Sequence, residues 1–445
     1  MKRTIIFGIL SLLGTSWVSA QVEHKCGYVD AIEKLDKEFP GIKLEMDKDY
    51  LESVQMAKYA TARRSKYDTV YNLQVVFHVL YNNNLENLHD SVILSQLEIL
   101  NEDYRRQNRD TSETREVFKS VAGDAKIQFK LATVDPVGNP TNGINRVSTS
   151  NNTFFDARRG DFMKFSSMGG VDAWDTKRYL NIWVCDYSIP NFGPSILGYA
   201  YPPKGAKNWT NQTNNVADNR QGVMLHYQIV GRYNRTATST TLRYALGRTG
   251  THEVGHYLGL RHTWGDGTNT TGCFVDDFVE DTPNERSQNG FNAICATNRN
   301  TCIDASNDLP DMTENYMDYS RNTCQNMFTV QQIAIMRNNL VMLRPGMAGD
   351  AELILNPGFS KIDLDFAILN NAVEENFQVH IANEDNDSKS IKIRNNLGQI
   401  VAEYKDQGKL EGKNINASFL ASGIYYVSVY SSSGNEINTG KLFKK

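Results

Sequence analysis

The sequence predicts an α+β domain with a mixed sheet, followed by a smaller all-β domain of the immunoglobulin-like sandwich type. The first part rests on β-rich runs that alternate with helical patterns over most of the chain. The second rests on short alternating segments, separated by turn residues, in the last quarter. The two parts meet at 344–350, where Pro345 and Gly346 interrupt a helical pattern. We therefore expect two folded units, 65–346 and 351–445.

Composition narrows the classes of partner. The chain has 445 residues, of which 40% are hydrophobic, so it is long enough for two or three domains. Its formal net charge is −4, whereas a nucleic-acid-binding or anionic-membrane-binding protein needs a basic surface. We therefore expect no nucleic-acid partner, and we expect the protein to be a monomer.

The first 20 residues resemble a secretory signal. Lys2 and Arg3 precede an apolar run from Ile5 to Leu13, and Val18-Ser19-Ala20 forms a small-residue cleavage site. A membrane anchor is the alternative, but the run is short and no later segment reaches the roughly 18 apolar residues of a transmembrane helix. We predict an exported, soluble protein without a transmembrane segment, in which disulfides can form.

Residues 21–64 have the pattern of a propeptide. The segment is charged, has apolar positions at helical spacing, and is divided by Pro40-Gly41. Arg63-Arg64 at its end is a candidate processing site. The alternative is a plain helical extension, since paired basic residues are common on solvated surfaces.

The next segment supplies the expected sheet and its first helix. Residues 73–80 form a β-rich run that is typical of a buried strand. Ile93, Leu97, Leu100 and Tyr104 lie on one helical stripe, with Asp90 or Ser91 as its cap. Further strands are expected at 127–134, 179–184 and 222–227, with an edge strand near 197–201.

The main chemical motif is His252-Glu253-Val254-Gly255-His256 and its continuation to His262. On a helix, His252 and His256 lie on one face and can bind a single zinc ion at roughly 2.0–2.1 Å. Glu253 lies close enough to act as a general base on a zinc-polarised water. Gly259 can adopt positive φ, end the helix and let His262 return as the third ligand. Three ligands leave the fourth position open, which is typical of catalytic zinc.

Two alternatives bear on this motif. A bare HExxH pattern occurs by chance on amphipathic helices, so the specificity lies in the extension to Gly259 and His262. A gluzincin-type enzyme would share HExxH but take a glutamate as its third zinc ligand. The presence of Gly259 and His262 argues against that class.

The extended motif resembles the metzincin clan of zinc peptidases, in which HExxHxxGxxH is followed by a methionine-containing turn. Residues 315–320, Asn-Tyr-Met-Asp-Tyr-Ser, are similar to that turn. The resemblance implies that Met317 forms an apolar floor below the zinc ligands. It also implies that Tyr319 hydrogen-bonds the tetrahedral intermediate. Taken alone, a methionine between two tyrosines is more often ordinary core.

Cys26-Gly27 in the predicted propeptide resembles the cysteine switch of several metzincins. A thiolate is a strong zinc ligand, so Cys26 over the open position would displace the catalytic water and keep the zymogen inactive. The alternatives are that Cys26 pairs with Cys185 or stays free.

The segment after His262 is loop-rich and contains four cysteines within 273–324, which indicates two disulfides in one of three pairings. Together with the zinc motif and the downstream Asp281-Thr282-Pro283, these cysteines resemble the pappalysin family over about 71–344. That resemblance implies the pairs Cys273 with Cys302 and Cys295 with Cys324. Pappalysin relatives also carry calcium near the acidic run of this segment. The candidate calcium ligands are Asp276, Asp277, Asp281 and Thr282; a solvated acidic loop is the alternative.

The chain then ends in a helix and the β-rich unit. Thr329 to Gln332 has the pattern of a capping box that opens a helix to about Leu343. Alternating segments follow at 378–382, 390–394, 400–404 and 424–430. Residues 351–445 resemble the C-terminal sorting domain of the Bacteroidetes type IX secretion system. That resemblance implies contact with the secretion machinery and either removal of the domain or attachment to the cell surface. The alternative is an adhesive or carbohydrate-binding sandwich.

Together these features predict a secreted zinc endopeptidase that acts on extracellular proteins or peptides and is made as a zymogen. The alternative is a catalytically inactive adhesion protein on the same scaffold, which would be expected to lack Glu253 or a histidine. The pocket for a substrate side chain is expected between Met317 and Cys324, where the sequence offers no clear acidic determinant of specificity.

Overall fold

A computed structural model gives the structure of the protein. It describes residues 25–61, 69–156, 160–204, 216–232, 234–266, 272–289, 295, 298–304, 308–348, 367–369, 372–373, 375–380, 388–405, 413–431 and 433–444. The predicted signal sequence and the paired arginines Arg63 and Arg64 lie outside these residues. Among the residues that the structure describes, no helix is both long and apolar enough to cross a membrane.

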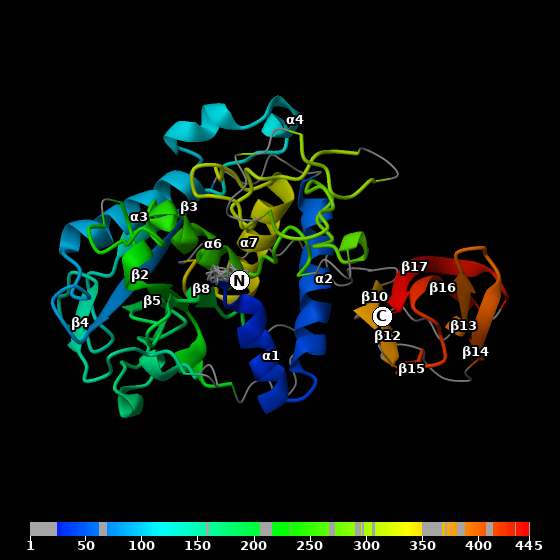
Figure 1. Ribbon diagram of the computed structural model, residues 1–445, viewed down its shortest axis with the longest axis horizontal. Coiled ribbons are helices and arrows are strands. Elements are labelled where there is room, and N and C mark those ends of the chain that lie inside the picture. Colours follow the sequence, from blue (N-terminus) through cyan, green and yellow to red (C-terminus); the bar gives the residue numbers. More distant parts are fainter. Residues whose placement is uncertain are drawn as a thin grey trace, which may run out of the picture.

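The larger unit is built on a seven-stranded sheet of order β1-β8-β9-β5-β2-β3, with β4 also paired to β2 (Figure 1). Most pairs are parallel, whereas β8 and β9 run antiparallel, so the predicted mixed sheet is confirmed. Its strands are β1 Lys25–Cys26, β2 Tyr71–Tyr81, β3 Ile127–Leu131, β4 Ile144–Ser148, β5 Tyr179–Cys185, β8 Ile196–Ala200 and β9 Val223–His226. A small hairpin, β6 Ser188–Ile189 with β7 Gly193–Pro194, lies outside this sheet.

In the described part of the larger unit, the sheet is accompanied by the helices α3 Asp90–Tyr104, α6 Arg248–Tyr257 and α7 Val330–Leu343. The short α4 Glu116–Lys119 is added to them. Helix α3 packs against α6, and the Tyr104 hydroxyl donates to the Thr251 carbonyl at 3.1 Å. The cap of α3 differs from the prediction: His89, not Asp90 or Ser91, is the N-cap, because its imidazole accepts from the Ser91 backbone N–H.

Two strand predictions needed correction. The strand expected at 127–134 ends at Leu131, where β3 stops pairing with β2. Strand β4 was not anticipated from the sequence, because Asn145 and Arg146 interrupt its apolar pattern and all its positions are at least partly exposed. It forms because β2 is long enough to pair with β3 through its first half and with β4 through its second.

The segment before the sheet forms two helices, α1 Tyr28–Glu38 and α2 Ile42–Thr61. They are separated at Pro40-Gly41 as expected, and Gly41 has φ +96°. In Figure 1, α1 and α2 lie side by side across the face of the larger unit that holds α6 and α7. The two residues of β1 extend the sheet by pairing in parallel with β8.

The chain between α6 and α7 is mostly loop. Disulfides join Cys273 to Cys302, with Cα atoms 5.6 Å apart, and Cys295 to Cys324, with Cα atoms 5.2 Å apart. These are the pairs that the pappalysin resemblance implies. Cys26 and Cys185 have free thiols, so the alternative pairing of these two cysteines does not occur.

The last unit is all-β, as predicted. A three-stranded sheet has the order β10-β12-β15 and a five-stranded sheet has the order β11-β17-β16-β13-β14. The strands are β10 Ala367–Leu369, β11 Ala372–Val373, β12 Asn376–His380, β13 Ser388–Asn395, β14 Ile400–Lys405, β15 Ile415–Asn416, β16 Gly423–Ser431 and β17 Glu436–Lys444. They enclose their own apolar cluster, which includes Phe377, Ile391 and Val427. That this unit is an immunoglobulin-like sandwich stays a prediction.

The capping box of α7 provides a test of the fold. The Thr329 hydroxyl accepts from the Gln332 backbone N–H at 3.2 Å, and the Gln332 side chain accepts from the Thr329 N–H at 3.0 Å. Thr329→Ala should lower the free energy of unfolding by about 1 kcal/mol, because it leaves an N-terminal amide of the helix unpaired. Denaturant unfolding followed by tryptophan fluorescence reports on the larger unit, since no tryptophan follows Trp264. Thr133→Ala, at an exposed position, is the control and should change stability by less than about 0.5 kcal/mol.

Candidate active site

The histidine motif lies on α6 and on the turn that ends it. The helix stops at Tyr257, and Gly259 has φ +97°. A Cβ atom at Gly259 would lie 2.2 Å from the side-chain nitrogen of Asn339 on α7, which donates to the Leu258 carbonyl at 3.0 Å. Glycine is therefore required here both for its backbone conformation and for the close approach of α7. The turn brings His262 back toward the helix, as the sequence predicted.

The three imidazoles converge through one nitrogen each. The Nε2 atoms of His252, His256 and His262 lie 3.1–3.2 Å from one another. Tetrahedral ligands at the usual zinc–nitrogen distance are about 3.3–3.4 Å apart, so the set fits zinc. The Nδ1 atoms point away: those of His252 and His256 bond the carbonyls of Tyr316 and Leu260 at 2.7 and 2.8 Å, and that of His262 bonds Asp266.

The electrostatics of the cluster suit a cation. Burial and the neighbouring His262 lower the pKa of His252 to about 3, and burial lowers the pKa of His256 well below its usual value. Both rings are therefore neutral at physiological pH and present a lone pair, which is the form that binds a metal. The Nδ1–H bonds to carbonyls and a carboxylate fix the tautomer that leaves Nε2 free.

Glu253 lies beside this cluster and is fully buried. Its Oε1 atom has no hydrogen-bond partner, and its Oε2 accepts from the Cys26 thiol at 3.4 Å. Burial raises the pKa of Glu253 to about 8. Strand β8 approaches closely, since a Cβ atom at Gly198 would lie 2.7 Å from Cγ of Glu253. The carboxylate therefore lies between the histidines and the edge of the sheet, where a proton acceptor for a polarised water is needed.

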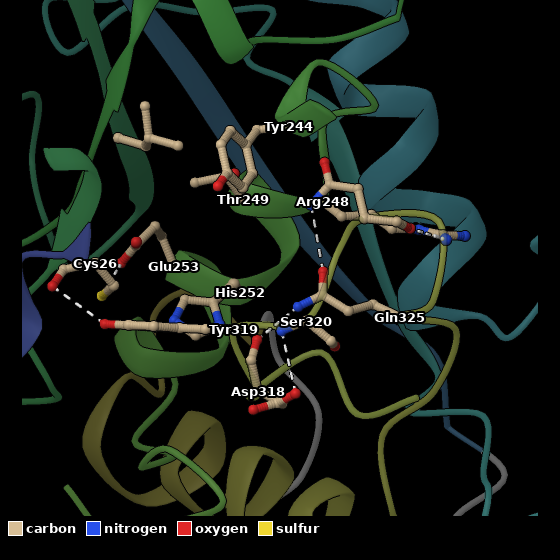
Figure 2. Close-up of a pocket in the computed structure, with 12 residues that line it drawn as sticks. Cys26, Tyr244, Arg248, Thr249, His252, Glu253, Asp318, Tyr319, Ser320 and Gln325 are labelled. Carbon is tan, nitrogen blue, oxygen red and sulfur yellow. Dashed lines mark hydrogen bonds between the residues drawn. The ribbon is translucent and has the colours of Figure 1, made fainter. Parts of the chain in front are cut away.

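Cys26 completes the cluster. Its Sγ and the three histidine nitrogens all lie within 4.8 Å of one another, and this is the one such group of possible metal ligands in the described part of the chain. Figure 2 shows its side chain directed toward Glu253, while the Tyr319 hydroxyl donates to the Cys26 carbonyl at 3.2 Å. Burial and the negative charge of Glu253 raise the pKa of the Cys26 thiol. A thiolate at this position therefore requires a nearby cation.

The methionine turn lies below α6. A Cβ atom at Gly255 would be 2.5 Å from the sulfur of Met317, so this buried methionine packs directly on the helix between the two histidines. The ring of Tyr319 lies 5.6 Å from that of His252 and 4.9 Å from that of His262. Met317 therefore packs against α6, and Tyr319 lies beside the histidine cluster; the roles that the resemblance implies for them stay predictions.

Three residues at the site were not singled out from the sequence. The Trp264 ring stacks on His262 at 4.3 Å, and the Tyr28 ring stacks on His256 at 4.0 Å. The carboxylate of Asp266 bonds His262 from a backbone with φ +63°. Only Asp266 carried a usable signal, since a carboxylate four residues from a ligand histidine is a common orienting partner. The aromatic contacts depend on how separate segments pack.

A pocket opens beside His252 and Glu253 (Figure 2). Its other walls include Leu197, Tyr244, Arg248, Thr249, Asp318, Ser320, Asn322 and Gln325. Arg248 forms an ion pair with Asp110, so its charge is already matched. The expected segment between Met317 and Cys324 does line this pocket. It brings one carboxylate that the sequence pattern did not single out, Asp318, which accepts from the backbone N–H groups of Ser320 and Asn289.

The candidate calcium ligands do not all converge. The Asp277 carboxylate accepts from the Thr282 hydroxyl at 2.8 Å, and burial together with Asp276 raises its pKa. Asp281 instead faces α7, where it accepts from the Gln331 backbone N–H at 2.9 Å. The acidic loop thus forms a pair of neighbouring acids, the partly buried Asp276 and the buried Asp277, and a separate contact to a helix N-terminus.

Comparison with known proteins supports the geometry. A family model described as "Pregnancy-associated plasma protein-A", of peptidase family M43, matches residues 169–341. The secretion system C-terminal sorting domain matches residues 371–445. An extracellular metalloprotease of Arthroderma gypseum is 26% identical over 63% of this chain and 76% of its own length. One from Arthroderma benhamiae is 28% identical over 64% and 77%.

Solved structures give closer matches. Mature mirolysin of Tannerella forsythia, in complex with a cleaved peptide, is 41% identical, with a TM-score of 0.54 over 63% of this chain and 96% of its own. A promirolysin mutant from the same organism is 38% identical, with a TM-score of 0.57 over 73% and 94%. The sorting domain and the extracellular relatives identify an exported protein of the type IX pathway. The chain therefore belongs to the pappalysin family of metzincin zinc metalloendopeptidases and carries a type IX secretion sorting tail.

Proposed function

We propose that the protein is a secreted zinc-dependent endopeptidase that cleaves extracellular proteins or peptides and is made as a zymogen silenced by Cys26. The observation that carries the proposal is the convergence of three imidazole nitrogens beside the buried side chain of Glu253. The structure of mature mirolysin, a relative of this chain, was solved in complex with a cleaved peptide. Retention of Glu253 and all three histidines favours a peptidase over an inactive adhesion protein.

Each residue has a defined task in the proposed reaction. His252, His256 and His262 hold zinc, which when bound polarises the scissile carbonyl and acidifies a water molecule. Glu253 accepts the proton of the attacking water and later delivers it to the leaving amine. The Tyr319 hydroxyl, which now donates to the Cys26 carbonyl, becomes free to donate to the substrate oxyanion once Cys26 leaves.

The substrate is proposed to bind along β8. In the present form β1 occupies this edge, and the Gly27 N–H donates to the Gly198 carbonyl at 2.8 Å. Backbone hydrogen bonds at a sheet edge give affinity without regard to side chains, so departure of β1 would open the edge to an extended peptide. The covered edge of β8 would block substrate binding. This is a second cause of latency in addition to the Cys26 thiol at the metal site.

We assign residues 1–20 to a signal peptide, 21–64 to the propeptide, 65–346 to the catalytic domain and 351–445 to the sorting domain. The share of this chain that is covered rises from 63% with mature mirolysin to 73% with promirolysin, which supports the assignment of a propeptide. We propose that cleavage near Arg63-Arg64 releases it and that the sorting domain is removed or anchors the protein at the surface.

Glu253→Ala should abolish most peptidase activity while zinc stays bound. Loss of a general base lowers the rate by at least ~10²-fold, whereas the three histidine ligands are untouched. Casein cleavage and elemental zinc content should be measured on the activated protein. His262→Ala is the contrasting variant and should lose both zinc and activity. Activity near the wild-type level in Glu253→Ala would refute the role of this carboxylate.

Cys26→Ser should shorten the lag before activity appears. Serine cannot supply a thiolate to zinc, so the variant should reach full activity sooner or without processing. The time course of peptide cleavage by freshly purified full-length protein measures this lag. Cys185→Ala removes the other free thiol of the described residues, which is buried away from the cluster, and should leave the lag unchanged. An identical lag in both variants would exclude the cysteine switch.

We further propose that calcium binds at the acidic loop through Asp276 and Asp277, since a cation would stabilise the carboxylate of Asp277, whose pKa is raised by burial and by repulsion from Asp276. Calcium at a hundred times its Kd should raise the melting temperature by about 4 °C or more. Differential scanning fluorimetry at fixed zinc measures the shift, with magnesium at the same ionic strength as the control. Asp277→Asn should remove the response. A wild-type melting temperature that does not change when calcium is added would contradict the proposed calcium site.

A further inference from the structure

Arg261, next to the third histidine, has partners that come from the proposed propeptide. Its guanidinium bonds the carboxylate of Asp47 on α2 and lies 4.1 Å from the ring centroid of Tyr50, also on α2. The side chains of Arg261 and Asp47 are only 17% and 14% exposed. The Tyr50 hydroxyl donates to the Asp277 carbonyl at 2.6 Å, which fixes the ring above the guanidinium. The cation is therefore matched and covered by residues that maturation would remove.

The surroundings of Arg261 form a second pocket, which shares no lining residue with the pocket beside Glu253. The catalytic domain contributes Pro202, Pro203, Gly259, Arg261, Asn339 and Leu343 to its wall, and the acid among the lining residues, Asp49, belongs to α2. Of the acids that raise the pKa of Arg261, Asp266 belongs to the catalytic domain, and it already bonds His262. Loss of α1 and α2 would leave a charged guanidinium, since arginine does not deprotonate in proteins.

Arg220 provides a comparison for Arg261, because it also pairs with an acid of the proposed propeptide, Glu38, at 2.8 Å. It keeps a second acid within the catalytic domain, because its Nε lies 3.6 Å from the carboxylate of Asp161. Removal of the propeptide would thus leave Arg220 matched and Arg261 unmatched.

The position of Tyr28 relates Arg261 to the substrate. Cys26 occupies the metal cluster, and Tyr28, two residues on, stacks on His256 and lines the same pocket as Arg261. An extended peptide that replaces β1 would carry a side chain two or three residues from the scissile bond into the same space. Guanidinium binds carboxylate through paired, charge-assisted hydrogen bonds.

We propose that Arg261 forms a carboxylate-binding subsite of the mature enzyme, which takes an Asp or Glu side chain two or three residues from the scissile bond. The subsite lies next to the position that Tyr28 occupies in the zymogen, in a pocket separate from the one beside Glu253. In the zymogen, Asp47 fills it. The inference rests on the proposed peptidase function and adds a class of substrate to it.

Peptide pairs that differ only in Glu or Gln test the subsite. The full-length protein is activated by limited proteolysis, and kcat/KM is measured with the pair placed in turn two and three residues to either side of the cleaved bond. The wild-type enzyme should prefer Glu by about tenfold at one of these positions, the expected size of a charge-assisted pair. Equal rates for Glu and Gln at all positions would overturn the subsite, whereas failure to cleave any peptide would instead refute the peptidase function.

Variants of Arg261 and Arg220 distinguish a loss of substrate recognition from damage to the fold. Arg261→Gln should bring the Glu-to-Gln ratio near one, and Arg261→Glu should reverse the charge preference in favour of a Lys peptide. A gained preference cannot arise from partial unfolding. Arg220→Gln, the matched control, should retain the wild-type ratio. If the Glu-to-Gln ratio is unchanged in Arg261→Gln, or if it falls equally in Arg220→Gln, Arg261 does not bind the substrate carboxylate.

Discussion

The site depends on holding the Nε2 atoms of three imidazoles within contact distance of one another. Their Nε2 atoms lie 3.1–3.2 Å apart, and these contacts lack donors if each Nδ1 carries the proton. Two backbone carbonyls and the carboxylate of Asp266 bind those protons and fix the rings. The fold thus creates a region of negative electrostatic potential at the three Nε2 atoms, even without a bound cation. The pKa values of His252 and His256, lowered by burial, follow from the same arrangement.

Rigid neighbours keep that arrangement in place. Asp103 on α3 accepts from the hydroxyls of Thr251 and Tyr316, which joins α6 to the methionine turn. Burial raises the pKa of Asp103 to about 6, although Arg248 acts in the opposite direction. Since the Tyr316 carbonyl also holds His252, one buried carboxylate indirectly orients a metal ligand. Such a network is costly to disturb because its polar groups have no access to water.

The N-terminal segment contacts the same groups that a substrate would contact. Strand β1 takes the edge of β8, the Cys26 thiol takes the open side of the histidine cluster, and Tyr28 covers His256. Asp47 matches the one arginine within the zinc motif. In the proposed zymogen, latency and substrate recognition therefore share one surface, and the contacts that hold the N-terminal segment in place coincide with the positions where we propose that a substrate binds.

The sequence by itself determined the chemistry: the spacing of His252, Glu253 and His256 requires only a helix, and the need for glycine at 259 follows from backbone sterics. Local sequence patterns also predicted β2, the α7 capping box and the break between helices at Pro40-Gly41. Contacts between distant segments were decided by the tertiary structure alone. Stacking of Trp264 and Tyr28 on the histidines and the pairing of Asp47 with Arg261 join residues far apart in the chain, or depend on ring orientation. Strand β4 likewise formed because β2 offered a free edge, a constraint that no local pattern records.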